Sequence, residues 1–184
     1  MTPKQLLYSF LISPGGLIIG ATLSAISLRI FFFPFTWKDL WIGLCIILSW
    51  PVLEYLAHRY LMHEWGVVDS KFLRKLESIL GIPFRFTHDR HHNSPTPETG
   101  LPDRWVIYMY YILAVVLLFT TPGMYTTYTV VLCMLCWYEF AHFACHSPYT
   151  PRTWWGFAIR ANHLQHHKDL PHRYSLLFPI IKVK

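Results

Sequence analysis

The sequence predicts an all-α integral membrane protein, with four transmembrane helices in two hairpins and a histidine-rich helical cap on one side of the bilayer. Hydrophobic residues form 53% of the 184 residues and charged residues only 14%. Four apolar stretches approach the roughly 20 residues that cross a bilayer as a helix. Ten of the eleven histidines lie in four short clusters. At this length we expect a single membrane-embedded domain over residues 1–184.

The first predicted hairpin joins an apolar stretch at residues 17–35 to a second at residues 40–56. Residues 13–16, Ser-Pro-Gly-Gly, precede it with a helix-start signal. Arg29 is the one charged residue of the first stretch, and it lies close enough to the end to extend its charge into water. Pro51 lacks a backbone N–H, so we expect a kink in the second stretch. The first stretch has no basic region before it, which argues against a cleaved signal peptide.

The second hairpin is predicted from apolar stretches at residues 105–121 and 125–146, separated by the turn signal Pro122-Gly123. Between the hairpins, residues 69–80 carry apolar side chains on one side and basic ones on another, as an amphipathic helix does. This helix would lie either at the membrane interface or packed on the cap. Three prolines and a glycine at residues 93–102 predict a loop that borders the entrance to a site.

Thr150 and Pro151 are typical of a helix start and predict a last helix that runs towards His167.

The distribution of charged residues predicts the orientation of the protein in the membrane. Fourteen of the 16 Lys and Arg residues lie on the histidine side, and only Arg29 and Lys38 lie on the other. By the positive-inside rule the histidines and both termini face the cytoplasm, in an endoplasmic reticulum or bacterial inner membrane. A membrane surface explains the net charge of +6 better than nucleic acid does.

The histidine clusters have the spacing of metal ligands. Two of them copy the pattern H-x-x-H-H, at residues 88–92 and 163–167. Positions i, i+3 and i+4 of a helix share one face, so each copy is expected to aim three imidazoles at one point. His58 and His63 are five residues apart, about 140° around an ideal helix. The helix must therefore end, bulge or bend there if both are to meet one site.

Ten imidazoles are more than one ion needs, since a structural zinc takes four ligands and a catalytic zinc three. We therefore expect two metal ions. Neutral imidazole binds zinc, iron, copper and nickel, so ligand type does not select among them. Glu54, Asp89 and Glu139 lie beside histidines and are expected to accept the second ring N–H of a metal ligand. The alternative is that these carboxylates pair with bases such as Arg59 as ordinary helix-end charges.

A nitrogen-rich metal site beside the hydrocarbon core points to an apolar substrate that arrives from lipid. Long alkyl chains offer no group for a zinc enzyme to hydrolyse. Redox iron, by contrast, can activate O2 for attack on an unactivated C–H bond, which favours an oxygenase.

The boxes H-R-Y-L-M-H, H-D-R-H-H, H-F-A-C-H and H-L-Q-H-H, in this order, resemble the histidine boxes of the fatty acid hydroxylase/sterol desaturase superfamily. The resemblance covers about residues 54–174 and includes E-Y-L-A-H-R and Y-E-F-A-H-F. It implies a four-helix membrane domain whose cytosolic cap holds two iron ions, although zinc can occupy the site in purified protein. The implied ligands are His58, His63, His88, His91, His92, His142, His146, His163, His166 and His167.

The same resemblance implies an enzyme that uses O2 and external electrons to hydroxylate a lipid, and we expect a fatty acyl chain. Its partners would be the bilayer lipid and a separate electron donor, cytochrome b5-like or ferredoxin-like with a reductase. Residues 169–178 depart from the tail that many members carry, so sterol or carotenoid oxidation is the alternative. A metal transporter predicts ionisable residues across the bilayer, which the apolar stretches nearly lack. A catalytically silent relative is the third hypothesis.

Overall fold

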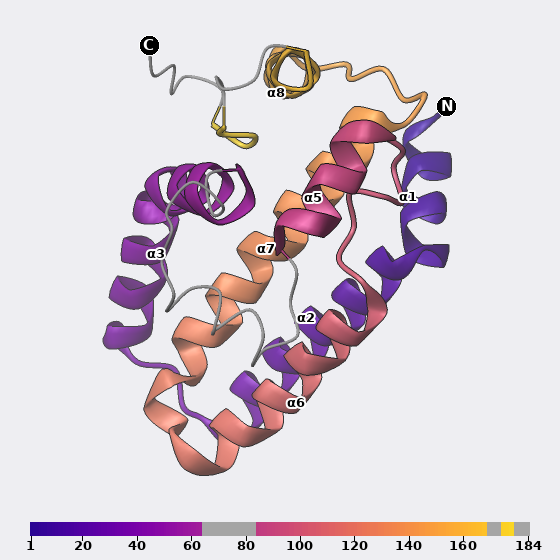
Figure 1. Ribbon diagram of the computed structural model, residues 1–184. Helices are drawn as coiled ribbons and strands as arrows, with labels where there is room; N and C mark the ends of the chain where they lie inside the picture. Colours follow the sequence, from indigo (N-terminus) through magenta and orange to yellow (C-terminus); the bar gives the residue numbers. More distant parts are fainter. Residues whose placement is uncertain (64–83, 169–173, 179–184) are drawn as a thin grey trace.

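The computed structural model describes residues 1–63, 84–168 and 174–178 (Figure 1), and every regular element in these ranges is helical. The predicted all-α class is confirmed. The predicted amphipathic helix at residues 69–80 lies outside the described residues. The elements are α1 (Pro3–Ile12), α2 (Pro14–Phe32), α3 (Trp37–Leu56), η1 (Ala57–His63), α5 (Phe84–Asn93), α6 (Arg104–Thr120), η2 (Pro122–Met124), α7 (Tyr125–His146) and α8 (Trp154–His166).

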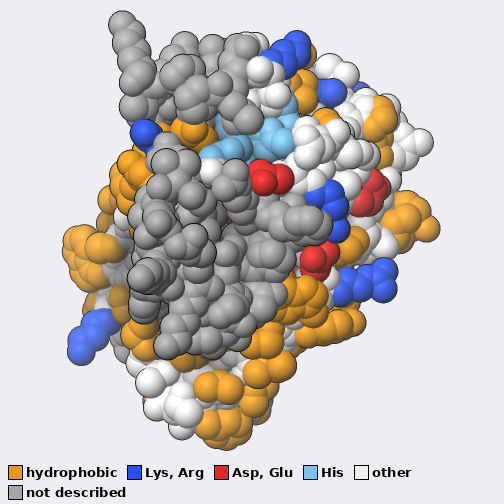
Figure 2. Space-filling model, viewed as in Figure 1, with side chains coloured by type: hydrophobic (Ala, Val, Ile, Leu, Met, Phe, Trp, Pro, Cys, Tyr) orange, Lys and Arg blue, Asp and Glu red, His pale blue; other side chains and the backbone are white. Residues whose placement is uncertain are grey.

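Three helical segments of the described chain are long and apolar enough to cross a membrane: Pro14–Phe32, Trp37–Tyr60 and Pro122–His146. The fourth expected span, α6, is apolar but has only 17 residues. Large apolar side chains point outward from these helices, for example Phe31, which is 82% exposed. Figure 2 shows hydrophobic side chains at the surface along the left and the lower right of the molecule. Such a surface is suited to lipid rather than water. The protein is therefore a multi-pass membrane protein.

Helix α7 is central to the bundle. It contacts α1, α2, α3, α6 and α8, and its orange ribbon runs through the middle of Figure 1. Ala21 and Ala25 of α2 pack with Leu132 of α7 in one small core, and small side chains of this kind let two helices approach closely. Near the N-terminus, Phe10 of α1 packs edge to face against Phe143 of α7. The histidine-bearing end of α7 is thus held by helices on several sides.

Side-chain caps explain where several helices begin. Thr2 caps α1 in a capping box, a helix that the sequence analysis did not predict. Ser13 caps α2 by accepting a hydrogen bond from the backbone N–H of Gly15 at 3.1 Å, as the Ser-Pro signal predicted. Thr153 caps α8, so the predicted start at Thr150 was one turn too early.

Arg29 does not extend into water as expected. It lies in a network at the end of the bundle opposite the histidines, where its Nη2 is 2.5 Å from Oδ1 of Asp39. Its Nε–H donates to the hydroxyl oxygen of Thr126 at 2.7 Å, and Thr126 in turn donates to Asp39. Because these residues belong to α2, α3 and α7, the network joins three membrane helices.

Candidate metal centre

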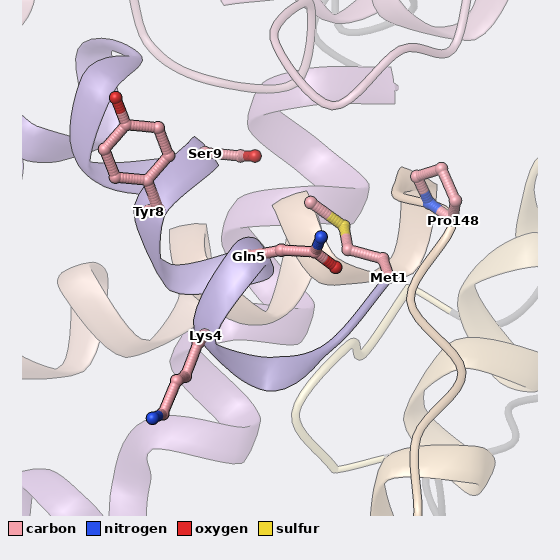
Figure 3. Close-up of a pocket in the computed structure, with 6 residues that line it drawn as sticks. All are labelled: Met1, Lys4, Gln5, Tyr8, Ser9 and Pro148. Carbon is pink, nitrogen blue, oxygen red and sulfur yellow. The ribbon is translucent and has the colours of Figure 1, made fainter.

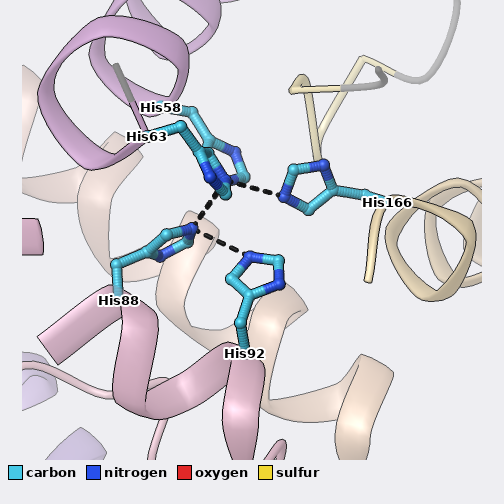
Figure 4. A group of neighbouring side chains, drawn as sticks. All are labelled: His58, His63, His88, His92 and His166. Carbon is cyan, nitrogen blue, oxygen red and sulfur yellow. Dashed lines mark hydrogen bonds between the residues drawn. The ribbon is translucent and has the colours of Figure 1, made fainter. Parts of the chain in front are cut away.

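Ten histidines gather at one end of the bundle, and part of this cluster reaches the surface in Figure 2, in pale blue. Their rings form two groups of five, and in each group one nitrogen from every ring lies within 4.8 Å of the others. The first group (Figure 4) is His58, His63, His88, His92 and His166. The second group is His91, His142, His146, His163 and His167.

A change of helix type brings His58 and His63 together. Helix α3, which contains Pro51, is followed directly by the π-helix η1, and the ribbon changes direction along this stretch in Figure 1. A π-helix is wider than an α-helix, so residues five apart lie near one face. The two rings stack with 5.1 Å between their centroids. The predicted break between these histidines is therefore confirmed, and it is a π-helical turn.

Each H-x-x-H-H box contributes to both groups, so the expectation that each box aims three imidazoles at one point was wrong. His88 and His92 belong to the first group, whereas His91 faces the second. Adjacent residues are about 100° apart on a helix, so positions i+3 and i+4 can turn to either side of position i. The second box does the reverse, with His163 and His167 in the second group and His166 in the first.

The first group turns its Nε2 atoms inward. Nε2 of His88 lies 2.9 Å from Nε2 of His63 and 3.0 Å from Nε2 of His92, as Figure 4 shows. The nitrogen of His166 lies 3.1 Å from that of His63. Nitrogens bound to one ion at about 2.1 Å are at most about 4.2 Å apart, close to the observed span. The five imidazoles therefore fit a metal ion.

The second group contains unpaired buried nitrogens. Nε2 of His91 and Nε2 of His142 are buried and have no hydrogen-bond partner within the described part of the chain. Nε2 of His146 lies 2.7 Å from Nε2 of His163. Buried polar atoms without partners are rare because each loses its bond to water, and a bound metal would satisfy them. This group also could hold an ion; that the ten histidines bind metal stays a prediction.

Burial keeps these imidazoles neutral. Burial first, and neighbouring imidazoles second, lower the pKa of His91, His92 and His167 to about 3. The same causes hold the pKa of His88 and His163 well below the usual value of a histidine. Neutral imidazole is the form that binds a metal. The site is therefore in the ligating protonation state at neutral pH.

Glu54 and Glu139 have surroundings that differ from those expected of them. Glu54 is only 5% exposed, but its Oε1 accepts hydrogen bonds from the backbone N–H groups of Leu176 and Leu177, the latter at 3.0 Å. Oε2 of Glu139 is buried without a hydrogen-bond partner in the ranges described. Among the described residues, neither carboxylate accepts a hydrogen bond from an imidazole N–H. The role expected of Asp89 stays a prediction.

Two other groups orient the rings. Nδ1 of His58 lies 2.6 Å from the carbonyl oxygen of Tyr174. A carbonyl only accepts, so Nδ1 must carry the hydrogen, and Nε2 is left to bind metal. The hydroxyl of Thr99 lies 3.2 Å from Nδ1 of His91. The sequence analysis missed both, because a backbone carbonyl has no residue signature and Thr99 was only part of a predicted loop.

A cavity of about 350 Å³ lies beside both groups and is reached by His58 from the first and His142 from the second. Its volume is in the range of small-molecule sites. Part of the predicted loop at residues 93–102 borders it, as expected. The apolar and aromatic lining residues include Trp50, Leu53, Leu101, Trp105, Leu135 and Tyr138.

A second hollow, of about 640 Å³, lies on the surface beside α1 (Figure 3). No histidine is among its lining residues in the described chain. Because none of the candidate metal ligands lines this hollow, the cavity beside the imidazoles is the candidate substrate site. The hollow is lined by Met1, Lys4, Gln5, Tyr8, Ser9 and Pro148.

Comparison with known proteins points to one family. The family described as fatty acid hydroxylase matches residues 43–182, which include all ten clustered histidines. A fatty acid 2-hydroxylase of Macaca fascicularis is 27% identical over 126 residues, which are 66% of this chain and 32% of that protein. The Homo sapiens protein of the same name is 26% identical over 123 residues, 64% of this chain and 31% of its own length. The chain thus spans about a third of these relatives. No solved structure matches it.

Proposed function

The chain belongs to the fatty acid hydroxylase family, and from this premise we propose that it is a di-iron membrane oxygenase that hydroxylates a lipid acyl chain. The reaction would insert one atom of O2 into a C–H bond and reduce the other to water with two electrons and two protons. The observation that carries this proposal is that both imidazole groups reach one apolar cavity. Iron would supply the redox activation of O2 that an unactivated C–H bond requires.

Each group of imidazoles would hold one iron ion, and zinc can take the same places in purified protein. The role of the chain is to orient the rings and keep them neutral. Tyr174 fixes the tautomer of His58 through its carbonyl, and the hydroxyl of Thr99 holds Nδ1 of His91 at hydrogen-bond distance. Such contacts around ligands commonly change metal affinity by about 10 to 100-fold.

The cavity supports an acyl chain as substrate. It lies between α3, which supplies Leu53, and α6, which supplies Trp105, and the outer faces of both helices are apolar. A lipid chain could therefore enter from the bilayer without crossing water. At about 350 Å³ the cavity is near the lower end of ligand-site volumes, which favours a section of a narrow chain over a sterol or carotenoid ring system. The relatives are named as 2-hydroxylases, and the product would tell whether this chain oxidises the same carbon.

We also propose a membrane arrangement, a location and an electron donor. The chain would form one domain over residues 1–184, with α6 as a fourth span. The excess of Lys and Arg on the histidine side supports a cytoplasmic site and cytoplasmic termini, in an endoplasmic reticulum or bacterial inner membrane. Electrons would come from a separate cytochrome b5-like or ferredoxin-like protein with its reductase.

Two single substitutions test the proposal because each removes a ligand from one group. His166→Ala affects the first group and His91→Ala the second, with the exposed Lys168→Ala as the control. We expect about two irons per chain in the wild type, about one in each single variant and almost none in the double variant. Lipid-dependent O2 consumption should be lost in all three histidine variants, and mass spectrometry should detect a hydroxylated acyl chain.

The other hypotheses predict different results. A hydroxylated sterol or carotenoid, with no acyl product, would move the substrate to the alternative class. Two bound irons without O2 uptake under any lipid and donor tested would indicate a silent relative. Metal uptake into vesicles that hold the purified protein would indicate a transporter.

A further inference from the structure

We propose that residues 174–178 form a buried strap that positions the first imidazole group, and that Glu54 acts on this group through the backbone of the strap. The inference rests on the proposed metal site. The strap has no regular secondary structure, yet Tyr174, Ser175, Leu176 and Leu177 are each at most 3% exposed. A buried irregular segment must find partners for its backbone polar groups, and those partners show what the strap does.

Glu54 holds one side of the strap. Its Oε1 accepts hydrogen bonds from the N–H groups of Leu176 and Leu177 and from the hydroxyl of Ser175, the last at 3.4 Å. Glu54 precedes His58 by one helical turn, so the residue that grips the strap and the ligand that the strap contacts belong to the same helix end.

Asn162 holds the other side. Its Nδ2–H donates to the carbonyl oxygen of Ser175 at 2.7 Å, and Asn162 is itself 5% exposed. Asn162 lies on α8, immediately before the H-x-x-H-H box at residues 163–167. The strap is therefore fixed between the end of α3, which continues into η1 with His58, and α8, which carries His166.

Tyr174 carries the effect to the imidazoles. Its carbonyl oxygen lies 2.6 Å from Nδ1 of His58 and fixes the ring tautomer that leaves Nε2 for a metal. Its side-chain ring lies 5.2 Å from the ring of His63 and 5.4 Å from that of His166, between centroids. One strap residue thus touches three of the five rings of the first group. Glu54 is a positioning residue because it acts on these rings through the strap.

The test is the metal content of Glu54→Ala in two backgrounds. Alone, this variant should bind about one iron instead of two, since only the second group remains intact. In the His91→Ala background it should remove the metal that is left. In the His166→Ala background, where the first site is already lost, it should change the iron content little. A general loss of fold would instead reduce metal binding in both backgrounds.

Two further variants make the test robust. Glu54→Gln keeps an oxygen that accepts backbone N–H groups, so it should retain more of the first metal than Glu54→Ala does. Asn162→Ala releases the other side of the strap and should repeat the selective loss, even if Glu54→Ala does not fold. Glu98→Ala, at an exposed carboxylate, is the control and should bind two irons.

The outcomes separate this inference from the proposed function. A wild type with two irons, together with Glu54→Ala and Asn162→Ala variants that also hold two, would overturn the strap and leave the oxygenase standing. Equal losses in the two histidine backgrounds would also overturn it. A wild type that binds no metal would overturn the proposed function itself.

Discussion

His166 packs its ring against His58 with 4.6 Å between the centroids, although the rest of its box serves the other imidazole group. His91 does the reverse and lies 4.5 Å from His142. Each group therefore takes an i, i+4 pair from one box and the i+3 residue from the other. Because of this exchange, neither metal can be bound by its full set of ligands unless the histidines of both H-x-x-H-H boxes face each other.

Metal removal should consequently loosen α5 and α8 together. Ligands that bind only the folded state add about 2.7 kcal/mol at one hundred times their Kd, and here that stabilisation should fall on the helices that carry the boxes. We expect a chelator to lower Tm and to speed hydrogen exchange in α5 and α8, while the α2–α7 contact at Ala21 and Leu132 keeps its protection. Loosening of α5 without α8 would contradict the shared arrangement.

Gly100 should be required by the second group. A Cβ at this position would lie 2.4 Å from a ring carbon of His142, so the ring or the loop must move. We expect Gly100→Ala to weaken the second metal by about tenfold or more and to spare the first. Competition with a chelator measures both affinities. Gly123→Ala is the matched control, because nothing lies within 4 Å of a Cβ there; equal metal binding in the two variants would refute the requirement.

The apolar stretches predicted the membrane helices well because hydropathy and helix length are local properties. The predicted stretch at residues 125–146 has the same bounds as α7. The predicted stretch at residues 17–35 begins three residues after α2 begins and ends three residues after α2 ends. Helix α1 was missed because its residues lack a strong pattern, although Thr2 and Gln5 do form a capping box.

The site was predictable in composition and not in arrangement. The spacing of the ten histidines identified them as candidate metal ligands and predicted an interruption of the helix between His58 and His63. It did not reveal the exchange of His91 and His166, because this depends on how the tertiary fold places the two H-x-x-H-H boxes relative to each other. The partners of Glu54 were also hidden, since they are backbone N–H groups that any residue but proline carries.

The Arg29 network should stabilise the bundle without affecting the metal site. The side chains of Arg29 and Asp39 are 12% and 10% exposed, so removal of one partner leaves a largely buried charge. We expect Arg29→Ala to lower the free energy of unfolding by about 3 kcal/mol, with two irons still bound. Reversible unfolding in detergent measures the loss, and Lys38→Ala, at an exposed neighbour, should change little. If the double variant Arg29→Leu, Asp39→Leu is no more stable than Arg29→Ala, the cost does not arise from an unpaired charge.

Acid should destabilise the metal-free protein. The pKa of His91, His92 and His167 is lowered to about 3 in the folded protein, mainly by burial, whereas a histidine in an unfolded chain has a pKa of about 6.5. Between these pKa values the unfolded state binds more protons than the folded state. The contribution of these three histidines to the free energy of unfolding is therefore complete above about pH 6.5 and is lost as the pH falls towards 3. We expect the Tm of the metal-free protein in detergent to be lower at pH 5 than at pH 7.5. The triple variant His91→Gln, His92→Gln, His167→Gln removes these groups and should show a smaller difference; an equal difference would place the titrating groups elsewhere.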